Sequence, residues 1–340
     1  MDSEFPENLN STEKQIAEAK LLIAQHLAVP VTEAKPVEIQ GCFSKTYEAT
    51  LKDGRNAIIQ FRIEPLEVGP FATAHQLLGD QVPIIEAIEA PHLTQQKVWP
   101  FYMSKIPGAT WLEQEEQWQD EQQIVCMKSL GRLYAKCFMP GSSDEAVEKV
   151  IDHLRRIRAL DEKDVSQYYE LIDHLIRSAP QLRSLPLFYT HFDLNGMNIL
   201  SDKAGQITGV VDWEMASVQP FGIGCGYIHY LAGEIVDKQW QERPAYDAME
   251  RGFWDSLFEK TDAKIRRQLM SNLDAVQTSV MIGTLFRIFG LEGEEIMVAE
   301  RLLKSLPILA KYRIPALRGS ATAYSGEPRR NPARAGRATS

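Results

Sequence analysis

Residues 190–214 read THFDLNGMNILSDKAGQITGVVDWE, and this stretch decides how the rest of the chain is interpreted. Asn198 opens a short apolar run, the letters SDKAGQ have the composition of a turn, and Ile207 to Val211 are mostly β-branched. Two short strands joined by a turn form a hairpin, which brings its two ends together. We therefore expect Asn198, at the start of the first strand, to lie beside Asp212, at the end of the second.

The side chains at these two ends suit a divalent metal. An amide oxygen and a carboxylate are hard ligands of the kind that Mg²⁺ binds, together with water and phosphate. Asp193 precedes Asn198 by five residues and would stand in a loop in front of that metal. One carboxylate to receive the proton of a hydroxyl, with an Asn and an Asp on the metal, is the set of groups that phosphoryl transfer needs.

The chain differs in secondary-structure pattern on the two sides of Pro107-Gly108. Before it, residues 37–62 contain three β-prone runs separated by turns, a helical segment follows at 71–78, and a strand pair ends at VWPFYMSKIPG. After it, helical periodicity dominates. It covers residues 121–139, 145–158, 164–178, 246–260 and 264–305. We expect an α+β protein with a small β-rich lobe and a large, mostly α-helical lobe.

The expected division of the chain follows from this switch. An N-terminal helix should begin with a capping box at Thr12 and Gln15 and stop before Pro30. The segments are an N-terminal helical segment at 1–36, the small lobe at 37–105, the large lobe at 106–316 and a tail at 317–340. The tail has five Arg and one Glu among Gly, Ser, Ala and Pro, so we expect disorder there. A nuclear-localisation or RNA-binding role for PRRNPARAGR is the alternative.

Composition excludes several classes of protein. The 340 residues are 44% hydrophobic and 24% charged, as in globular proteins, and the four cysteines lack CxxC spacing, so reduced thiols are expected. The sequence shows no secretory signal and no run of about 18 apolar residues, and we expect a cytoplasmic protein without a membrane segment. The net charge of −9 argues against nucleic acid as the main partner.

The spacing His-x-Asp-x-x-x-x-Asn, followed about a dozen residues later by an apolar residue and Asp-Trp, resembles that of aminoglycoside phosphotransferases and choline kinases. The stretch DWEMASVQPFG further resembles a subset common among uncharacterised fungal members. The resemblance covers most of residues 37–316 and is most specific in 188–222. It implies a protein-kinase-like fold, ATP and Mg²⁺ as cofactors, and transfer of the γ-phosphate to a hydroxyl of an aminoglycoside, choline or another small molecule.

The resemblance assigns roles in the large lobe. Asp193 would be the catalytic base, and Asn198 and Asp212 would hold the metal. His191 would orient the loop by packing and hydrogen bonding, although without the motif a buried His is the plain interpretation. These residues form the expected catalytic centre.

The resemblance also assigns nucleotide contacts in the small lobe. Gly41 and Ser44 would lie in a loop whose backbone N–H groups meet phosphate oxygens. In the hinge MSKIPG, the carbonyl group of Ser104 and the N–H group of Ile106 would pair with the adenine edge. A lone glycine is more often only a turn, so the loop is the weaker of these two assignments.

The strand NAIIQFRIE departs from the family pattern because it has no Lys to contact the phosphates. Gln60 and Arg62 lie on one strand face, and we choose Arg62 because phosphate requires a cation. The acidic partner on the next helix is missing too, and Glu67 is the nearest acid. A catalytically weak or inactive nucleotide-binding pseudoenzyme is therefore the alternative function.

A protein kinase is the less favoured reading. The sequence has no GxGxxG loop and no closing Ala-Pro-Glu, and His-Phe-Asp stands where a protein kinase has His-Arg-Asp. A small hydroxylated acceptor is expected instead.

The sequence leaves the class of acceptor open. Glu214 and the acids in residues 290–295 could form a wall for a polycation, or the latter could sit in the first turn of a helix. Trp213, Tyr227 and His229 could line an aromatic pocket, or belong to the core.

Overall fold

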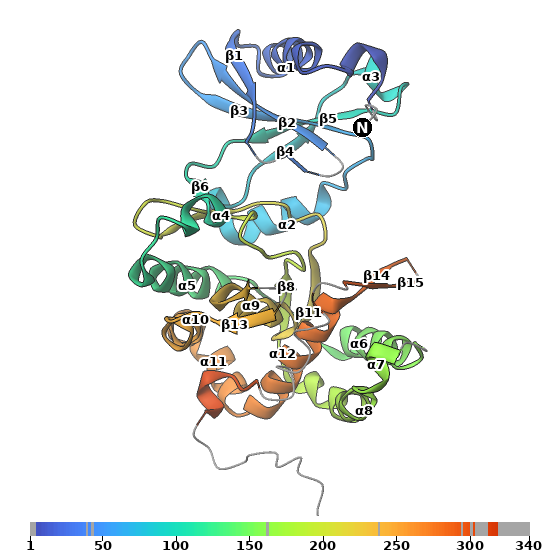
Figure 1. Cartoon of the computed structure of the whole chain (residues 1–340), viewed down its shortest axis with the longest axis vertical. Helices are drawn as coiled ribbons and strands as arrows, with labels where there is room; N and C mark the ends of the chain where they lie inside the picture. The colour runs from blue at the N-terminus through green and yellow to red at the C-terminus, as the bar shows by residue number, and fades with distance from the viewer. Residues whose placement is uncertain are drawn as a thin grey trace, which may run out of the picture.

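The computed structural model describes residues 5–38, 40–41, 44–160, 163–236, 239–293, 295–299, 302 and 312–318. Five antiparallel strands in the order β1-β2-β3-β5-β4 form the sheet of the small lobe (Figure 1). They are β1 Val31–Pro36, β2 Ser44–Leu51, β3 Asn56–Arg62, β4 Ile85–Ala87 and β5 Trp99–Ser104. Buried and more exposed residues alternate along β2 and β3, as expected for a sheet with one packed face.

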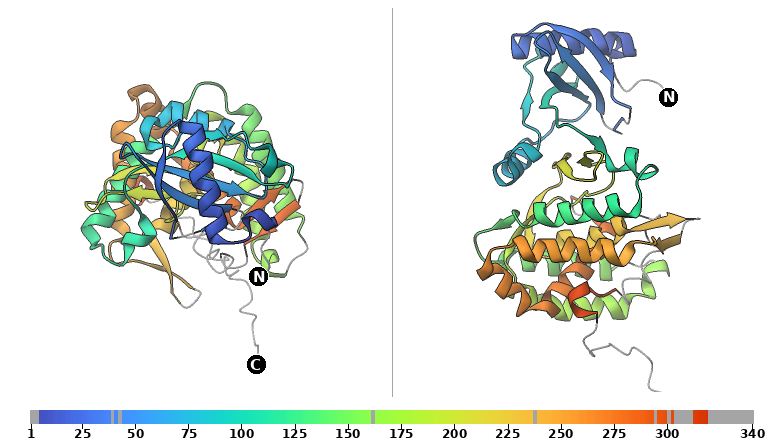
Figure 2. Two further views of the ribbon diagram at one scale, coloured as in Figure 1. Left: turned by 90° about the horizontal axis from the view of Figure 1, so that it is seen from above. Right: turned by 90° about the vertical axis from the view of Figure 1, so that its left-hand side faces the viewer.

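Helix α1 (Thr12–Leu27) lies across the packed face of this sheet (Figure 2). Its N-cap is Ser11, whose hydroxyl accepts from the N–H of Lys14, one residue before the expected cap. Gln15 instead accepts a hydrogen bond from the Tyr47 hydroxyl of β2. The predicted helical segment 1–36 is wrong at its end: the helix stops at Ala28 in the left-handed conformation, and β-branched residues after Pro30 form β1.

Helix α2 (Gly69–Leu78) lies between the two lobes (Figure 1), where a helix was predicted for residues 71–78. Its buried residues Phe71, Ala74 and Leu78 belong to the hydrophobic core of the large lobe, whereas the sheet and α1 share a separate core. The Tyr189 hydroxyl of the large lobe donates to the carbonyl of Pro70 at 2.8 Å. The short elements η1 Glu7–Leu9, η2 Gly79–Gln81 and α3 Pro91–Thr94 complete the small lobe.

The chain crosses between the lobes at Gly108. The φ angle of Gly108 is +117°, and a Cβ there would lie 2.6 Å from the carbonyl oxygen of Ser201. Only glycine fits this close approach. The next residues, β6 (Ala109–Thr110), pair with β9 (Ile199–Ser201), and β9 pairs with β10 (Ile207–Val210). The crossing segment is thus fixed directly on the hairpin predicted from the sequence.

Helices make up most of the large lobe, and the expected α+β fold with two unlike lobes is confirmed. Helices α5 (Asp120–Tyr134) and α10 (Tyr246–Lys260) pack side by side (Figure 2). The other helices are α4 Trp111–Glu115, α6 Asp144–Arg158, α7 Lys163–Ser166, α8 Tyr169–Ser178, η3 Ala179–Ser184, η4 Ile223–Tyr227, α9 Ile228–Ala232, α11 Ala263–Met270, α12 Leu273–Ile288 and η5 Pro315–Leu317. Among the described residues, no helix is both long and apolar enough to span a bilayer.

Strands interrupt two segments for which only helix was predicted. Residues 121–139 end in β7 (Phe138–Met139), which pairs with β8 (Leu187–Thr190), the neighbour of β11 (Ser217–Pro220). The segment 264–305 breaks after α11, and α12 gives way at Ile288 to the hairpin of β14 (Phe289–Glu292) and β15 (Glu295–Val298). Gly293 turns this hairpin at φ +60°, and Glu292 and Glu295 lie in its strands and not in the first turn of a helix. Glu294 lies outside the described residues. A second hairpin consists of β12 (Gly233–Val236) and β13 (Gln239–Glu242).

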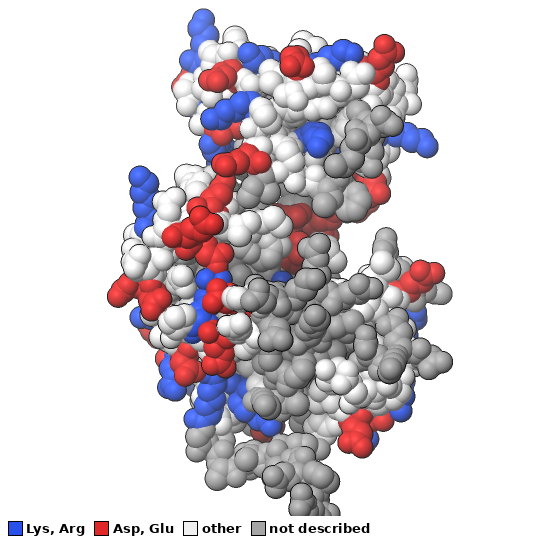
Figure 3. All heavy atoms as spheres, viewed as in Figure 1, with Lys and Arg blue, Asp and Glu red and all other residues white. Residues whose placement is uncertain are grey.

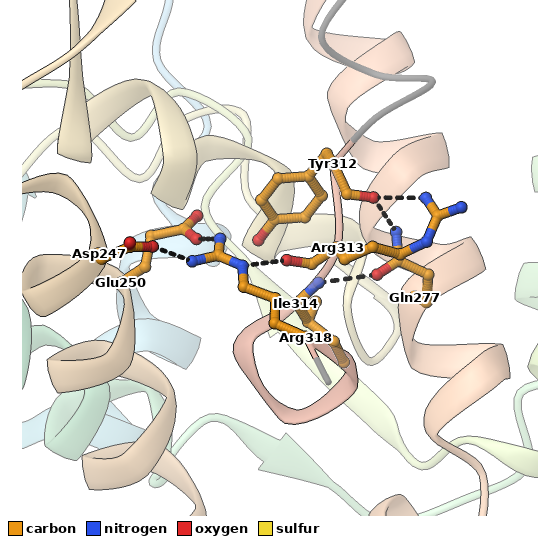
Figure 4. Close-up of polar contacts among 7 residues, drawn as sticks. All are labelled: Asp247, Glu250, Gln277, Tyr312, Arg313, Ile314 and Arg318. Atoms are coloured by element: carbon orange, nitrogen blue, oxygen red, sulfur yellow. Dashed lines mark hydrogen bonds and ion pairs between the residues drawn. The ribbon is translucent and has the colours of Figure 1, made fainter. Parts of the chain in front are cut away.

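Residues 312–318 are fastened to α10 and α12 by side-chain hydrogen bonds (Figure 4). The amide of Gln277 donates to the carbonyl of Tyr312 at 3.0 Å and accepts from the N–H of Ile314 at 2.8 Å. Arg318 donates to Asp247 at 2.6 Å and to the fully buried Glu250. Arg318 was expected in the disordered tail and is instead anchored, while residues 319–340 lie outside the described residues.

The described cysteines Cys126, Cys137 and Cys225 are free thiols in the core, as predicted. Cys42 lies outside the described residues.

Candidate active site

The hairpin of β9 and β10 brings its two ends together as predicted. Ile199 pairs with Val210, and the N–H of Val211 donates to the carbonyl of Asn198 at 2.9 Å. Asp212 follows with φ +63°, a left-handed conformation that is costly for a residue other than glycine. Phe192, next to Asp193, has φ +60°. Two of the four left-handed residues other than glycine in the described part of the chain therefore lie at the turns that carry Asp193 and Asp212.

The loop of residues 191–198, which we name the catalytic loop after its expected role, is held by hydrogen bonds to Asp193. The side-chain amide of Asn198 donates to the Asp193 carbonyl at 2.8 Å and to its Oδ2 at 3.1 Å. The amide of Asn195 donates to Oδ1 at 3.2 Å. The carboxylate is thus oriented by an amide on each oxygen. Because the nitrogen of the Asn198 amide donates to Asp193, the oxygen of that amide is the atom that could bind a metal.

His191 connects the catalytic loop to the end of the hairpin. Its Nε2 donates to the carbonyl of Val211 at 2.8 Å, and its Nδ1 accepts from the N–H of Asp193 at 3.2 Å. Burial lowers the pKa of His191 to about 4, so the ring is neutral and these two bonds fix its tautomer. The ring also packs edge-on against Trp213 at 4.7 Å. His191 therefore has the contacts of an orienting residue.

Asp212 is an exposed residue whose carboxylate has acidic neighbours. Desolvation of the carboxylate, with the charges of Asp193 and Glu214, raises its pKa to about 6, and the charge of Arg62 acts in the opposite direction. In the described part of the chain, no group donates a hydrogen bond to this carboxylate. Acidic side chains are visible in the hollow between the lobes (Figure 3). A divalent cation would supply the compensation that protein groups do not.

The residues that could hold a metal are too few for a site made of protein ligands alone, and would suit a metal that also binds a ligand. Among the described residues, no three His, Cys, Asp or Glu side chains are grouped as in an all-protein metal site. Asn198 and Asp212 supply one neutral and one anionic oxygen, which fits Mg²⁺ that keeps water and binds phosphate oxygens.

Arg62, the cation expected to contact the phosphates, is paired with an acid of the large lobe. Arg62 donates from Nη2 to both carboxylate oxygens of Glu214, at 3.0 and 2.8 Å. Gln60 accepts from Arg62 at 3.4 Å and donates to the hydroxyl groups of Ser44 at 3.0 Å and Thr46 at 3.3 Å. Gln60 thus supports Arg62 from the same strand face.

Glu67, the acid nearest to the expected partner position, is exposed. The partner of Arg62 is Glu214, so Glu214 does not stand free as part of an acidic acceptor wall.

The remaining expected nucleotide contacts lie along the edge of the small lobe. Gly41 lies close to the Ser44 hydroxyl at the start of β2, while Cys42 and Phe43 lie outside the described residues. Ser104 at the end of β5 exchanges two hydrogen bonds of 2.9 Å with the backbone of Ile84. Ile106 is buried at the crossing between the lobes. Their contacts with adenine and phosphate remain predictions.

Two further side chains donate hydrogen bonds to backbone carbonyls of the catalytic loop. The Tyr227 hydroxyl donates to the carbonyl of Phe192, and Arg287 of α12 donates to the carbonyl of Leu194 at 3.2 Å. Sequence reasoning missed Arg287 because it lies 93 residues from Leu194. It also missed Asn195, although Asn195-Gly196 is typical of a turn whose Asn binds the backbone two residues on, as it does at Met197.

The aromatic residues considered for an acceptor pocket are packed in the core. Trp213, Tyr227 and His229 are at most 4% exposed. Trp213 donates to the carbonyl of Val210 at 2.8 Å and stacks on Tyr189. Trp213 and Tyr227 pack against the catalytic loop from the core. The interpretation of the three aromatic residues as core residues therefore fits the structure.

Residues 37–243 match the sequence pattern of the phosphotransferase enzyme family (APH). The chain belongs to this family. The match spans more than half of the 340 residues and includes both ends of the hairpin. A curated relative of this chain, Clavilactone A biosynthesis cluster protein Y from Ampulloclitocybe clavipes, is 46% identical over 55 residues, which are 16% of this chain and 13% of that protein. The chain thus matches only about an eighth of that relative's length.

Solved structures share the fold of this chain at low identity. Plasmodium vivax ethanolamine kinase is 13% identical with a TM-score of 0.51, over 94% of this chain and 92% of that chain. A thermostable variant of the aminoglycoside phosphotransferase APH(4)-Ia, in ternary complex with ADP and hygromycin B, is 12% identical with a TM-score of 0.51, over 79% of this chain and 90% of that chain. The predicted family and its kinase-like fold are confirmed.

Proposed function

We propose that this protein transfers the γ-phosphate of ATP to a hydroxyl group of a small molecule, with Mg²⁺ as the metal. The observation that carries the proposal is the catalytic loop itself: Asp193 is held by hydrogen bonds from Asn198 and aligned through His191 with the residue before Asp212. Family membership supports a phosphotransferase, and the solved relative in complex with ADP supports use of a nucleotide.

Each group has a definite part in this proposal. Asp193 orients the acceptor hydroxyl and accepts its proton, and the amides of Asn195 and Asn198 keep the carboxylate in position. Asn198 and Asp212 hold the metal, which when bound neutralises phosphate charge. His191 stays neutral and orients the loop.

The nucleotide is proposed to bind between the lobes. Arg62 contacts the phosphates from β3, with Gln60 and Ser44 behind it. Gly41 lies in the phosphate loop, and backbone groups of Ser104 and Ile106 pair with adenine. A cytoplasmic location and a small hydroxylated acceptor belong to the same proposal.

A pseudoenzyme is the second candidate, and one observation favours it. Arg62, the cation that replaces the family's Lys, is engaged by Glu214 and would have to share its guanidinium with phosphate. A protein of this kind would bind ATP without transferring phosphate.

Two substitutions test the proposed function. Asp212→Ala should abolish Mg²⁺-dependent ATP binding in calorimetry, because a metal ligand is lost. Asp193→Asn should leave ATP binding intact and lower formation of phosphorylated product by about 10²-fold or more, because the base is lost while size and polarity are kept. Asp152→Asn, on the exposed face of α6, is the matched control that should change neither quantity.

The acceptor must first be found by screening hydroxylated compounds for ATP consumption. Unchanged ATP affinity in Asp212→Ala would refute the metal assignment. Binding of ATP without phosphorylated product from any acceptor would favour the pseudoenzyme.

A further inference from the structure

The last turn of α12 places a guanidinium group beside the proposed base. Arg287 donates from Nη1 to the carbonyl oxygen of Leu194, and its Cζ lies 4.4 Å from the ring centroid of Tyr227. Tyr227 in turn donates to Phe192. Phe192 and Leu194 are the two neighbours of Asp193, so Arg287 contacts the chain on both sides of it, once directly and once through Tyr227.

Arg287 differs from other partly buried arginines in its partners. Arg62, Arg243 and Arg318 each form an ion pair, with Glu214, Glu115 and Glu250. Arg287 forms no ion pair with any carboxylate in the described part of the chain, and its Nε is buried without a hydrogen-bond partner. Removing a guanidinium from water without an anion is costly. Since no described carboxylate compensates the charge of Arg287, an anionic group of a bound ligand would lower this cost.

The same contacts disfavour a cationic acceptor. The rings of Tyr227 and Tyr230 lie 4.4 and 4.9 Å from the Arg287 Cζ, so the protein's own cation already occupies faces that could otherwise hold a quaternary ammonium. Glu214, the acid expected to attract a polycation, is neutralised by Arg62. Glu295 is exposed on the hairpin that extends beyond α12.

We propose that Arg287 is a specificity-determining residue that binds an anionic group of the acceptor, so that the acceptor is a hydroxylated anion such as a hydroxycarboxylic acid. The inference rests on the proposed function, since it names the substrate class of the same site. A guanidinium suits this task because it offers several N–H groups in one plane to carboxylate oxygens.

Matched sets of ligands test the charge preference by binding alone. One set is 4-hydroxybutyrate, 4-hydroxybutyramide and 4-amino-1-butanol, and another is 4-(hydroxymethyl)benzoate with its amide and the corresponding benzylamine. Titration calorimetry of the full chain with Mg²⁺ and a non-hydrolysable ATP analogue gives the Kd of each. In at least one set, the carboxylate should bind about 10-fold or more tighter than its amide, as expected for a charge-assisted hydrogen bond.

Substitutions assign this preference to Arg287. Arg287→Gln should bring the Kd values of carboxylate and amide to within about twofold of each other, and Arg287→Glu should favour the amine. Arg287→Lys keeps the charge and should retain part of the preference, which also covers the case that Arg287→Gln does not fold. Arg132→Gln on α5, which replaces an arginine bonded to Gln206, is the matched control and should bind like the wild type.

The results separate this inference from the proposed function. Equal binding of carboxylate and amide by the wild type, binding of neither, or a preference that survives Arg287→Gln would overturn the inference. If Arg287 only positions the catalytic loop, its variants lower kcat equally for every acceptor and leave the Kd ratios unchanged. Carboxylate binding that depends on Arg287 but gives no phosphorylated product would keep the anion site and refute phosphoryl transfer.

Discussion

Arg62 of β3 and Glu214, 152 residues later in the sequence, form two hydrogen bonds of 3.0 and 2.8 Å that connect the two lobes. The Arg62 side chain is 9% exposed and that of Glu214 is 36% exposed, so the pair is largely shielded from water. Glu214 lies two residues beyond Asp212, and the charge of Arg62 partly opposes the rise in the pKa of Asp212. The only cation of β3 on this face is therefore tied to the turn that carries the proposed metal ligand.

A double-mutant cycle should show that this pair stabilises the fold. Arg62→Gln and Glu214→Gln should each lower the free energy of unfolding, with a coupling energy of about 1–2 kcal/mol, between the values of exposed and buried pairs. Urea denaturation of the wild type, both single variants and the double variant measures it. Lys105→Gln with Glu48→Gln, a pair within the small-lobe region, is the comparison cycle. A coupling energy near zero would mean that the pair adds nothing to stability.

Tyr227→Phe should impair catalysis more than nucleotide binding. The substitution removes the hydroxyl that holds the carbonyl of Phe192, a residue with φ +60°, and leaves that partly buried carbonyl without its donor. We expect a loss of about 1–3 kcal/mol in stability and a several-fold lower kcat with an unchanged Kd for ATP. Calorimetry and product formation measure the two effects. A wild-type kcat would show that the loop keeps its geometry without Tyr227.

Gly283→Ala should destabilise the large lobe. A Cβ at Gly283 of α12 would lie 1.9 Å from the carbonyl oxygen of Ile223 in η4, and neither backbone can yield without separating the two helices. The expected loss in the free energy of unfolding is about 3 kcal/mol or more. Gly290→Ala is the control, because nothing lies within 4 Å of a Cβ there, and it should change stability by less than about 0.5 kcal/mol. Equal stability of the two variants would contradict the packing argument.

Glu250→Gln should change the pH dependence of stability. Burial raises the pKa of Glu250 from 4.5 to about 7, although Arg318 and the hydroxyls of Tyr312 and Tyr246 oppose the rise. Between these values the folded protein holds a proton that the unfolded chain has released, so the free energy of unfolding falls as pH rises. The nearby Asp247 carboxylate also faces Arg318.

The variant lacks this titration. The stability of the wild type minus that of Glu250→Gln should therefore decrease from pH 5 to 7, by at most about 1.4 kcal/mol per pH unit. Thermal and urea unfolding at several pH values measure the difference. Parallel curves for the two proteins would show that Glu250 does not titrate in this range.

Local pattern was enough to predict the catalytic hairpin, because turn and strand signals lie within about a dozen residues of each other. The local pattern could not predict the ion pair of Arg62 with Glu214, because nothing in the residues around Arg62 indicates an acid 152 positions away. The family pattern directed attention to Glu67 on the following segment instead. Partners that tertiary packing supplies cannot be read from neighbouring residues.

The errors in secondary structure have similar causes. Residues 289–298 continue the apolar spacing of α12, and short apolar runs do not distinguish a strand from a helix. The turn at Gly293 decides the matter, since it lets β15 fold back on β14. At the other end of the chain, Pro30 was correctly expected to stop α1, but the strand that begins directly after it was assigned to the helical segment.

The hairpins β12–β13 and β14–β15 leave the large lobe where α9 and α12 end, and in the described part of the chain each pairs only within itself. Helices α9 and α12 carry Tyr230 and Arg287. A mutation or insertion in either hairpin, or replacement of the hairpin, would therefore change the surface next to Arg287. The hydrogen bonds that hold Asp193 would stay in place. Changes in these hairpins, by natural mutation or by grafting from a relative, would thus alter acceptor specificity and leave the reacting groups unchanged.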